Sequence, residues 1–137
     1  MRCKTFTSLP DDAKSIRIEV FVDEQGFTEE FDTDDERATH IVGYADDNAI
    51  ATCRVLSNGD GSYFIGRIAV KKDYRKRNFG AQIVDFAEKY IKANDGHRIY
   101  IHSQEQAVLF YTKLGYKDTG ERDFEEGCPH RMLTKQL

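Results

Sequence analysis

Residues 67–81, with the sequence RIAVKKDYRKRNFGA, form the stretch that decides the fold. Its first part, Arg67 to Val70, has the apolar and β-branched character of a strand, and a basic loop from Lys71 to Asn78 follows. Gly80 then lies at the start of a long amphipathic helical pattern. Because the first amides of a helix carry partial positive charge and have no partner within the helix, this strand, loop and helix predict a site for a phosphate group.

The residues of this loop suit an anion in their backbone as well as in their charge. Gly80 lets the backbone approach an anion closely, and Asn78 belongs to the few residue types that tolerate a left-handed conformation. Arg75 and Arg77 add positive charge. A pyrophosphate is the group we expect here.

Helical and strand patterns alternate on both sides of this unit. The segment 27–37 has little apolar periodicity and is predicted to be a surface loop. The strands expected in the rest of the chain are 4–7, 39–45, 49–56, 63–70, 98–102, 116–122 and 130–137, and the helices are 10–25, 79–93 and 107–114. This order predicts an α+β fold with a mixed sheet, and the lack of linkers or repeats predicts a single domain over residues 1–137.

Charge is divided unevenly along the chain, whose formal net charge is −4. Residues 23–36 contain eight acids and neither Lys nor Arg, whereas residues 71–77 contain five bases and one acid. One acidic and one basic surface indicate a cationic substrate and an anionic cofactor, and two solvated loops are the alternative.

Several classes of protein are disfavoured by composition. No apolar run approaches the roughly 20 residues of a membrane span, so we expect a cytoplasmic protein without membrane contact. The three cysteines are distant from one another, so reduced thiols are expected. The triplet Cys128 to His130 lacks the number and spacing of zinc ligands, His102 is interpreted as a structural residue, and no metal is expected.

A second motif, FYTKLGY at residues 110–116, follows Gln104 to Ala107. Together the two motifs resemble the GCN5-related N-acetyltransferase (GNAT) family, whose pyrophosphate motif is Arg/Gln-x-x-Gly-x-Gly/Ala. Its later motif is Asn-x-x-Ala-x-x-Phe-Tyr-x-x-Leu-Gly-Phe. The segments VFVDEQG (20–26) and GCPHRM (127–132) are similar to the small bacterial ElaA-like and YjcF-like branch.

The resemblance implies an acyl-CoA acyltransferase fold: a central mixed sheet of about six to seven strands with helices on both faces. It further implies that amides from Arg75 to Ala81 hold the pyrophosphate of acetyl-CoA, and that the backbone of residues 68–70 pairs with the pantetheine arm. Asn78 stands where the family has glycine, and Gln104 where it has asparagine. The cofactor-binding residues so implied are Ile68, Ala69, Val70, Arg75, Lys76, Arg77, Asn78, Phe79, Gly80, Ala81, Gln104 and Tyr111.

Tyr111 matches the family tyrosine that protonates the departing thiolate, and a phenol is protonated at neutral pH. Some relatives carry a catalytic glutamate on the strand before the cofactor loop, but residues 61–72 contain no Asp or Glu. Glu24, Glu30 and His40 are the candidates for the general base, acting directly or through water. The sequence does not choose among them.

The function expected from these features is transfer of an acetyl group from acetyl-CoA to a primary amine of a small molecule or peptide, by direct attack. A cationic acceptor such as a polyamine, an aminoglycoside or lysine is indicated by the acidic segment. An acyl-CoA-binding sensor with little catalysis is the alternative. The acidic remainder of the chain argues against nucleic-acid binding through residues 71–77, and a monomer and a homodimer are both compatible with the sequence.

Overall fold

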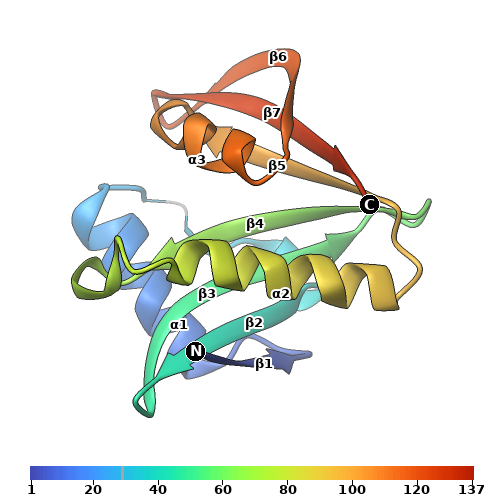
Figure 1. Cartoon of the computed structure of the whole chain (residues 1–137). Helices are drawn as coiled ribbons and strands as arrows, with labels where there is room; N and C mark the ends of the chain where they lie inside the picture. The colour runs from blue at the N-terminus through green and yellow to red at the C-terminus, as the bar shows by residue number, and fades with distance from the viewer. Residues whose placement is uncertain (29) are drawn as a thin grey trace.

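The computed structural model describes residues 1–28 and 30–137, and it contains a seven-stranded sheet in the order β1-β2-β3-β4-β5-β7-β6 (Figure 1). Strands β4 and β5 are parallel, and the other neighbouring pairs are antiparallel. The strands are β1 (Arg2–Phe6), β2 (Thr39–Ala45), β3 (Asn48–Ser57), β4 (Ser62–Val70), β5 (Arg98–Gln104), β6 (Lys117–Glu125) and β7 (Cys128–Gln136). The helices are α1 (Asp11–Arg17), α2 (Phe79–Ala93) and α3 (Val108–Lys113).

Helices cover both faces of the sheet, as predicted. Alternation along β2 separates two cores, because Ile41 lies in the core beneath α2 and Val42 in the core beneath α1. The buried apolar side chains of α2 are Ile83, Val84, Ala87 and Ile91. Those of α1 are Ala13 and Ile16. The predicted mixed α+β fold of six to seven strands is confirmed.

The helix predicted over residues 10–25 has the expected extent but not the expected geometry. It is α-helical only to Arg17 and continues as a π-helical segment, Ile18–Glu24. A π-turn holds more residues than an α-turn, and a pattern of apolar residues does not reveal this local change. Val20 and Phe21 are buried in this wider segment.

The acidic segment also contains more structure than the predicted surface loop. Residues Thr33–Glu36 form a 3₁₀ turn, capped by reciprocal hydrogen bonds between Asp32 and Asp35. Asp35 is buried. The segment is therefore part of the packed structure.

Strands β4 and β5 pair at one end only. Ser62 to Phe64 lie opposite Arg98 to Tyr100, and β4 then bends away from β5 at a bulge, where Arg67 has a left-handed φ of 51°. Two residues of β4, Arg67 and Ile68, oppose a single residue of β3 at this bulge. Figure 1 shows the two strands together at one end and apart near the start of α2.

None of the helices in the described part of the chain combines the length and apolarity needed to cross a bilayer.

Candidate active site

The opening between β4 and β5 contains a cavity of about 720 Å³. Phe64 to Ile68 of β4 form one wall, and Ile101 to Gln104 of β5 form the opposite one. Tyr111 of α3 and residues of the acidic segment complete the lining. Residues of both predicted motifs, 67–81 and 110–116, therefore line the same cavity.

Along this opening β4 keeps an edge without a strand partner in the described chain, since its pairing with β5 ends at Phe64. On its other side Ala69 pairs with Thr52 and Val70 with Ala51 of β3. An extended ligand could therefore add to β4 from the open side, next to Ile68 and Val70.

The predicted anion loop has the backbone that such a site requires. Asn78 is the N-cap residue of α2 and is left-handed, with φ of 67°, and Lys76 has φ of 62°. A Cβ atom on Gly80 would approach Cζ of Phe110 to 3.2 Å, so glycine also allows α2 and α3 to pack closely. Phe79 and Ala81 follow in the first turn of α2, whose amides lack helical partners.

The loop cations differ in their surroundings. Arg77 is exposed, and its guanidinium lies 5.4 Å from the ring centroids of both Tyr74 and Phe79. Arg75 donates two hydrogen bonds to the carboxylate of Glu24, at 2.9 and 2.8 Å, and one to the carbonyl of Val70. Glu24, a candidate base from the π-helical segment, therefore forms an ion pair with Arg75 of the predicted anion loop.

Tyr111 and Gln104 both line the cavity. Tyr111 is 7% exposed and makes edge contacts with the rings of Phe110 and Tyr116. Burial raises the pKa of the Tyr111 phenol, so it remains protonated at neutral pH. The Gln104 amide donates a hydrogen bond to the side chain of Gln25 at 2.8 Å.

Glu30 lies in a buried ion-pair network that fixes the acidic segment. Arg17 of α1 bonds Glu30 at 2.9 Å and Asp35 at 2.8 Å. Arg54 of β3 bonds Asp35 at 2.9 Å, and Arg67, at the β4 bulge, bonds Glu30 at 3.0 Å. Arginines from α1, β3 and β4 thus pair with three acids of this segment, Glu30, Asp32 and Asp35.

The pKa values of the two buried carboxyl groups in this network are shifted in opposite directions. Burial raises the pKa of Glu30, and the charges of Arg67 and Arg17 only partly oppose this. Burial would also raise the pKa of Asp35, but hydrogen bonds and charge from Arg17, with a further hydrogen bond from Arg54, lower it to about 2. Glu30 lines the cavity. Asp35 is buried, is not among the described residues that line the cavity, and stays ionised at neutral pH because its pKa is lowered.

His40, the third candidate base, is 1% exposed on β2. Its Nε2 lies 2.9 Å from the backbone carbonyl oxygen of Asp35, to which it donates, and burial lowers the pKa of the ring. His40 is thereby a neutral anchor for the 3₁₀ turn. His40 is not among the described residues that line the cavity, and its role as a base stays a prediction.

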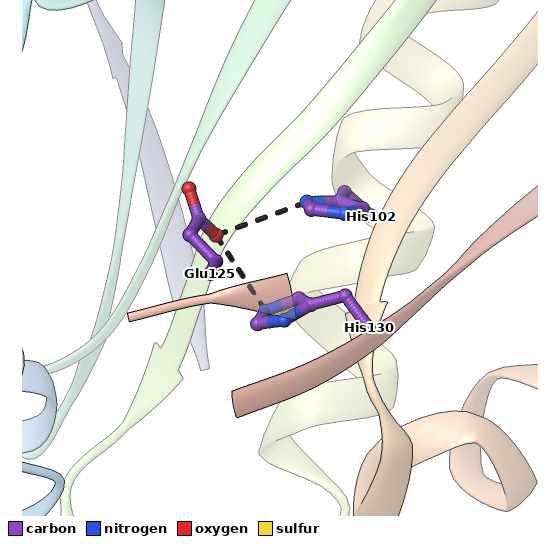
Figure 2. Close-up of side chains that lie close together, drawn as sticks. All are labelled: His102, Glu125 and His130. Carbon is purple, nitrogen blue, oxygen red and sulfur yellow. Dashed lines mark ion pairs between the residues drawn. The ribbon is translucent and has the colours of Figure 1, made fainter. Parts of the chain in front are cut away.

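Among the cavity residues that were not predicted to belong to the site are His102, Glu125 and His130. Figure 2 shows both imidazole rings with a nitrogen directed toward the carboxylate of Glu125. Oε2 of Glu125 lies 3.8 Å from Nδ1 of His102 and 3.6 Å from Nε2 of His130. Their positions in the sequence follow no motif spacing, and His102, which was interpreted as a structural residue, lies in the cavity wall.

Comparison with known proteins agrees with this architecture. The family described as "Acetyltransferase (GNAT) domain" matches residues 10–137. The "Uncharacterized N-acetyltransferase YjcF" of Bacillus subtilis is 34% identical over 127 residues, which cover 90% of each chain. The chain therefore belongs to the GNAT family, and the resemblance inferred from its motifs is confirmed.

Solved structures show the same fold at lower identity. Escherichia coli ElaA superposes with a TM-score of 0.86 at 24% identity, over 98% of both chains. A Bacillus subtilis acetyltransferase in complex with CoA superposes with a TM-score of 0.75 at 22% identity, over 99% of this chain and 98% of that one.

Proposed function

We propose that residues 1–137 form a single catalytic domain that transfers an acetyl group from acetyl-CoA to a primary amine within the cavity between β4 and β5. The observation that carries this proposal is the convergence of three features on one opening: an unpaired edge of β4, an anion loop at the start of α2, and the Tyr111 phenol. Membership of the acetyltransferase family supports the reaction class.

The cofactor would lie along β4 with its pyrophosphate at α2. Amides from Arg75 to Ala81 would bind the phosphate oxygens, and the backbone of Ile68 and Val70 would pair with the amides of pantetheine. Gln104 would contact the cofactor from β5. The CoA complex of the Bacillus subtilis acetyltransferase, which shares the fold, supports this choice of cofactor.

In the reaction, the amine nitrogen attacks the thioester carbonyl, forming the carbon–nitrogen bond, and the carbon–sulfur bond then breaks. The thiolate of CoA takes a proton, for which the buried Tyr111 phenol is the proposed donor. The amine must lose a proton as it attacks. Of the three candidate bases, Glu30 is the one that lines the cavity, and its raised pKa favours proton uptake.

The acceptor remains a primary amine of a small molecule or peptide in this proposal. Glu30, Asp32 and Asp35 are paired with arginines, so the acidic run offers an acceptor less negative charge than its sequence indicates. Glu125, at the end of β6, is a further carboxylate in the cavity wall. With no cation bound at Glu125, a cationic acceptor would be attracted mainly to that end of the cavity.

Binding of CoA, measured by calorimetry, tests the cofactor site. Gly80→Glu is expected to weaken binding at least about tenfold, because it introduces a carboxylate where the phosphates would lie. Lys89→Glu, a charge change on the exposed surface of the same helix, is the control and should bind CoA as the unaltered protein does. Equal binding by Gly80→Glu and the control would contradict the site.

A panel of primary amines with acetyl-CoA tests catalysis. Release of CoA thiol, together with an acetylated product detected by mass spectrometry, is expected for at least one polyamine, aminoglycoside or lysine compound. Tight CoA binding without turnover over the panel would instead favour the sensor alternative.

A further inference from the structure

His102, Glu125 and His130 come from three neighbouring strands and meet by register. Antiparallel pairing sets Gln104 of β5 opposite His130 of β7, so His102 is diagonal to His130 on the shared surface. The ring centroids of the two histidines are 4.5 Å apart. Glu125 ends β6 directly before the tight turn into β7, and its carboxylate reaches both rings (Figure 2).

The second nitrogen of each ring is held by an acceptor. Nδ1 of His130 lies 2.9 Å from the carbonyl oxygen of Cys128, which can only accept, so Nδ1 carries the hydrogen. Nε2 of His102 lies 2.6 Å from Oδ1 of Asp123, and it likewise donates. In the neutral rings, the lone pairs of His130 Nε2 and His102 Nδ1 are therefore the atoms that face Glu125.

With both rings neutral, this arrangement brings three electron-pair donors together. The three facing atoms all lie within 4.8 Å of one another. Such a group is stabilised by a shared cation. The nearby cation Arg131 is already paired with Glu105 and Asp118.

We propose that His102, Glu125 and His130 bind a divalent transition-metal ion, with Zn²⁺ as the best match. Two imidazoles with one carboxylate favour such an ion over Mg²⁺ or Ca²⁺, which prefer oxygen ligands. The hydrogen bonds from the outer nitrogens to Asp123 and to the Cys128 carbonyl are those that orient histidine ligands in metal sites.

Metal binding would require a contraction of the cluster and a rotation of the rings, because the three facing atoms lie up to 4.8 Å apart and the imidazoles are stacked with an interplanar angle of 25°. Ligand atoms around a tetrahedral Zn²⁺ lie about 3.3 Å apart, since each is about 2.0–2.1 Å from the metal. The two distances to Glu125 are 3.6 and 3.8 Å, and its half-exposed side chain is free to close them. Three protein ligands leave a coordination position open, and all three residues line the cavity, so this position would face the space proposed for the acceptor.

This site differs from the sequence expectation that no metal is bound. The ligand positions 102, 125 and 130 form no recognisable metal motif, and the site depends on strand register. The inference does not depend on acetyl transfer, so its failure and that of the proposed function are separable.

The test is titration of the chelator-treated full chain with ZnCl₂ by calorimetry and with Co²⁺ by visible absorption. We expect one Zn²⁺ per chain and cobalt d–d bands, with Zn²⁺ affinity reduced at least about tenfold in His102→Asn, Glu125→Gln and His130→Asn. His97→Asn, at an exposed histidine outside the cluster, is the matched control and should bind as the unaltered chain does.

His130 is only 4% exposed, so its variant could lose structure rather than a ligand. Asp123→Asn avoids this, because the Asp123 side chain is 61% exposed, and it should weaken Zn²⁺ binding about 10-fold to 100-fold through His102 alone. Zn²⁺ binding to the unaltered chain that is no tighter than binding to a His102→Asn/His130→Asn double variant would overturn the proposal. CoA binding by the same samples reports separately on the proposed function.

Discussion

Arg17 is the residue whose removal should most affect the wall of the proposed acceptor site. Its guanidinium is 1% exposed and bonds the carboxylates of Glu30 and Asp35 as well as the backbone carbonyl of Glu30. Arg17→Met retains most of the aliphatic volume but leaves two buried carboxylates short of a partner. Removing one side of a buried ion pair costs about 3–5 kcal/mol.

The remaining arginines place the expected loss of stability at the low end of this range of about 3–5 kcal/mol. Arg54 still bonds Asp35, and Arg67 still bonds Glu30, so we expect a loss of about 3 kcal/mol in the free energy of unfolding. At this chain length, that corresponds to a fall in Tm of roughly 12 °C. Urea denaturation at neutral pH measures the loss, with an unchanged m-value as evidence that the unfolded surface is the same.

Arg37→Met is the matched control. Arg37 pairs with Asp34, but their side chains are 58% and 43% exposed, so its removal should cost less than about 1 kcal/mol. A loss for Arg17→Met within the range of this control would refute the view that the buried network holds the acidic segment in place. Adding Glu30→Gln to Arg17→Met should recover part of the lost stability, because one uncompensated charge is removed.

Three further outcomes are expected. Glu24→Gln should strengthen CoA binding about twofold to fivefold by releasing Arg75 and removing a negative charge beside the anion loop, and loss of turnover with unchanged CoA binding would instead make Glu24 the base. Tyr111→Phe should lower kcat about 10²-fold to 10⁴-fold without changing CoA affinity. Burial raises the pKa of Tyr111, so the phenol should still be protonated at about pH 10. If activity falls at a lower alkaline pH, another group is responsible, and the residual activity of Tyr111→Phe should show the same fall. For Asp35, a folded-state pKa of about 2 against an ordinary 3.8 means that it stabilises the fold above about pH 4, and that this contribution is lost as pH falls toward 2. Tm measured over this range should therefore fall less steeply in Asp35→Asn, and equal slopes would contradict the assignment.

Local patterns were sufficient for most of the fold. Helical periodicity from Phe79 to Ala93 and the turn at Asp46 and Asp47 predicted α2 and the β2–β3 hairpin, because both depend on residues close in sequence. The bulge at Arg67 was not predicted. It is a feature of the register between β3 and β4, which no local pattern records.

The cofactor side of the site was predictable and the acceptor side was not. Arg75 to Ala81 form one contiguous motif, so the sequence alone is enough to predict an anion site there. His102 and His130 meet only through strand register, and Glu30 owes its surroundings to Arg17 and Arg67, which are distant in sequence. From the sequence, the acidic run indicated a negatively charged surface. In the fold, three of its carboxylates, Glu30, Asp32 and Asp35, are paired with arginines.

The central claim is that this chain binds acetyl-CoA at the start of α2 and acetylates a primary amine. Its most direct test is incubation of the purified chain with acetyl-CoA and the amine panel, with thiol release and product mass measured in parallel for the unaltered chain and Gly80→Glu. We expect amine-dependent thiol release matched by an acetylated product, both strongly reduced in Gly80→Glu. Failure of the unaltered chain to bind CoA, or turnover unaffected by Gly80→Glu, would contradict the account.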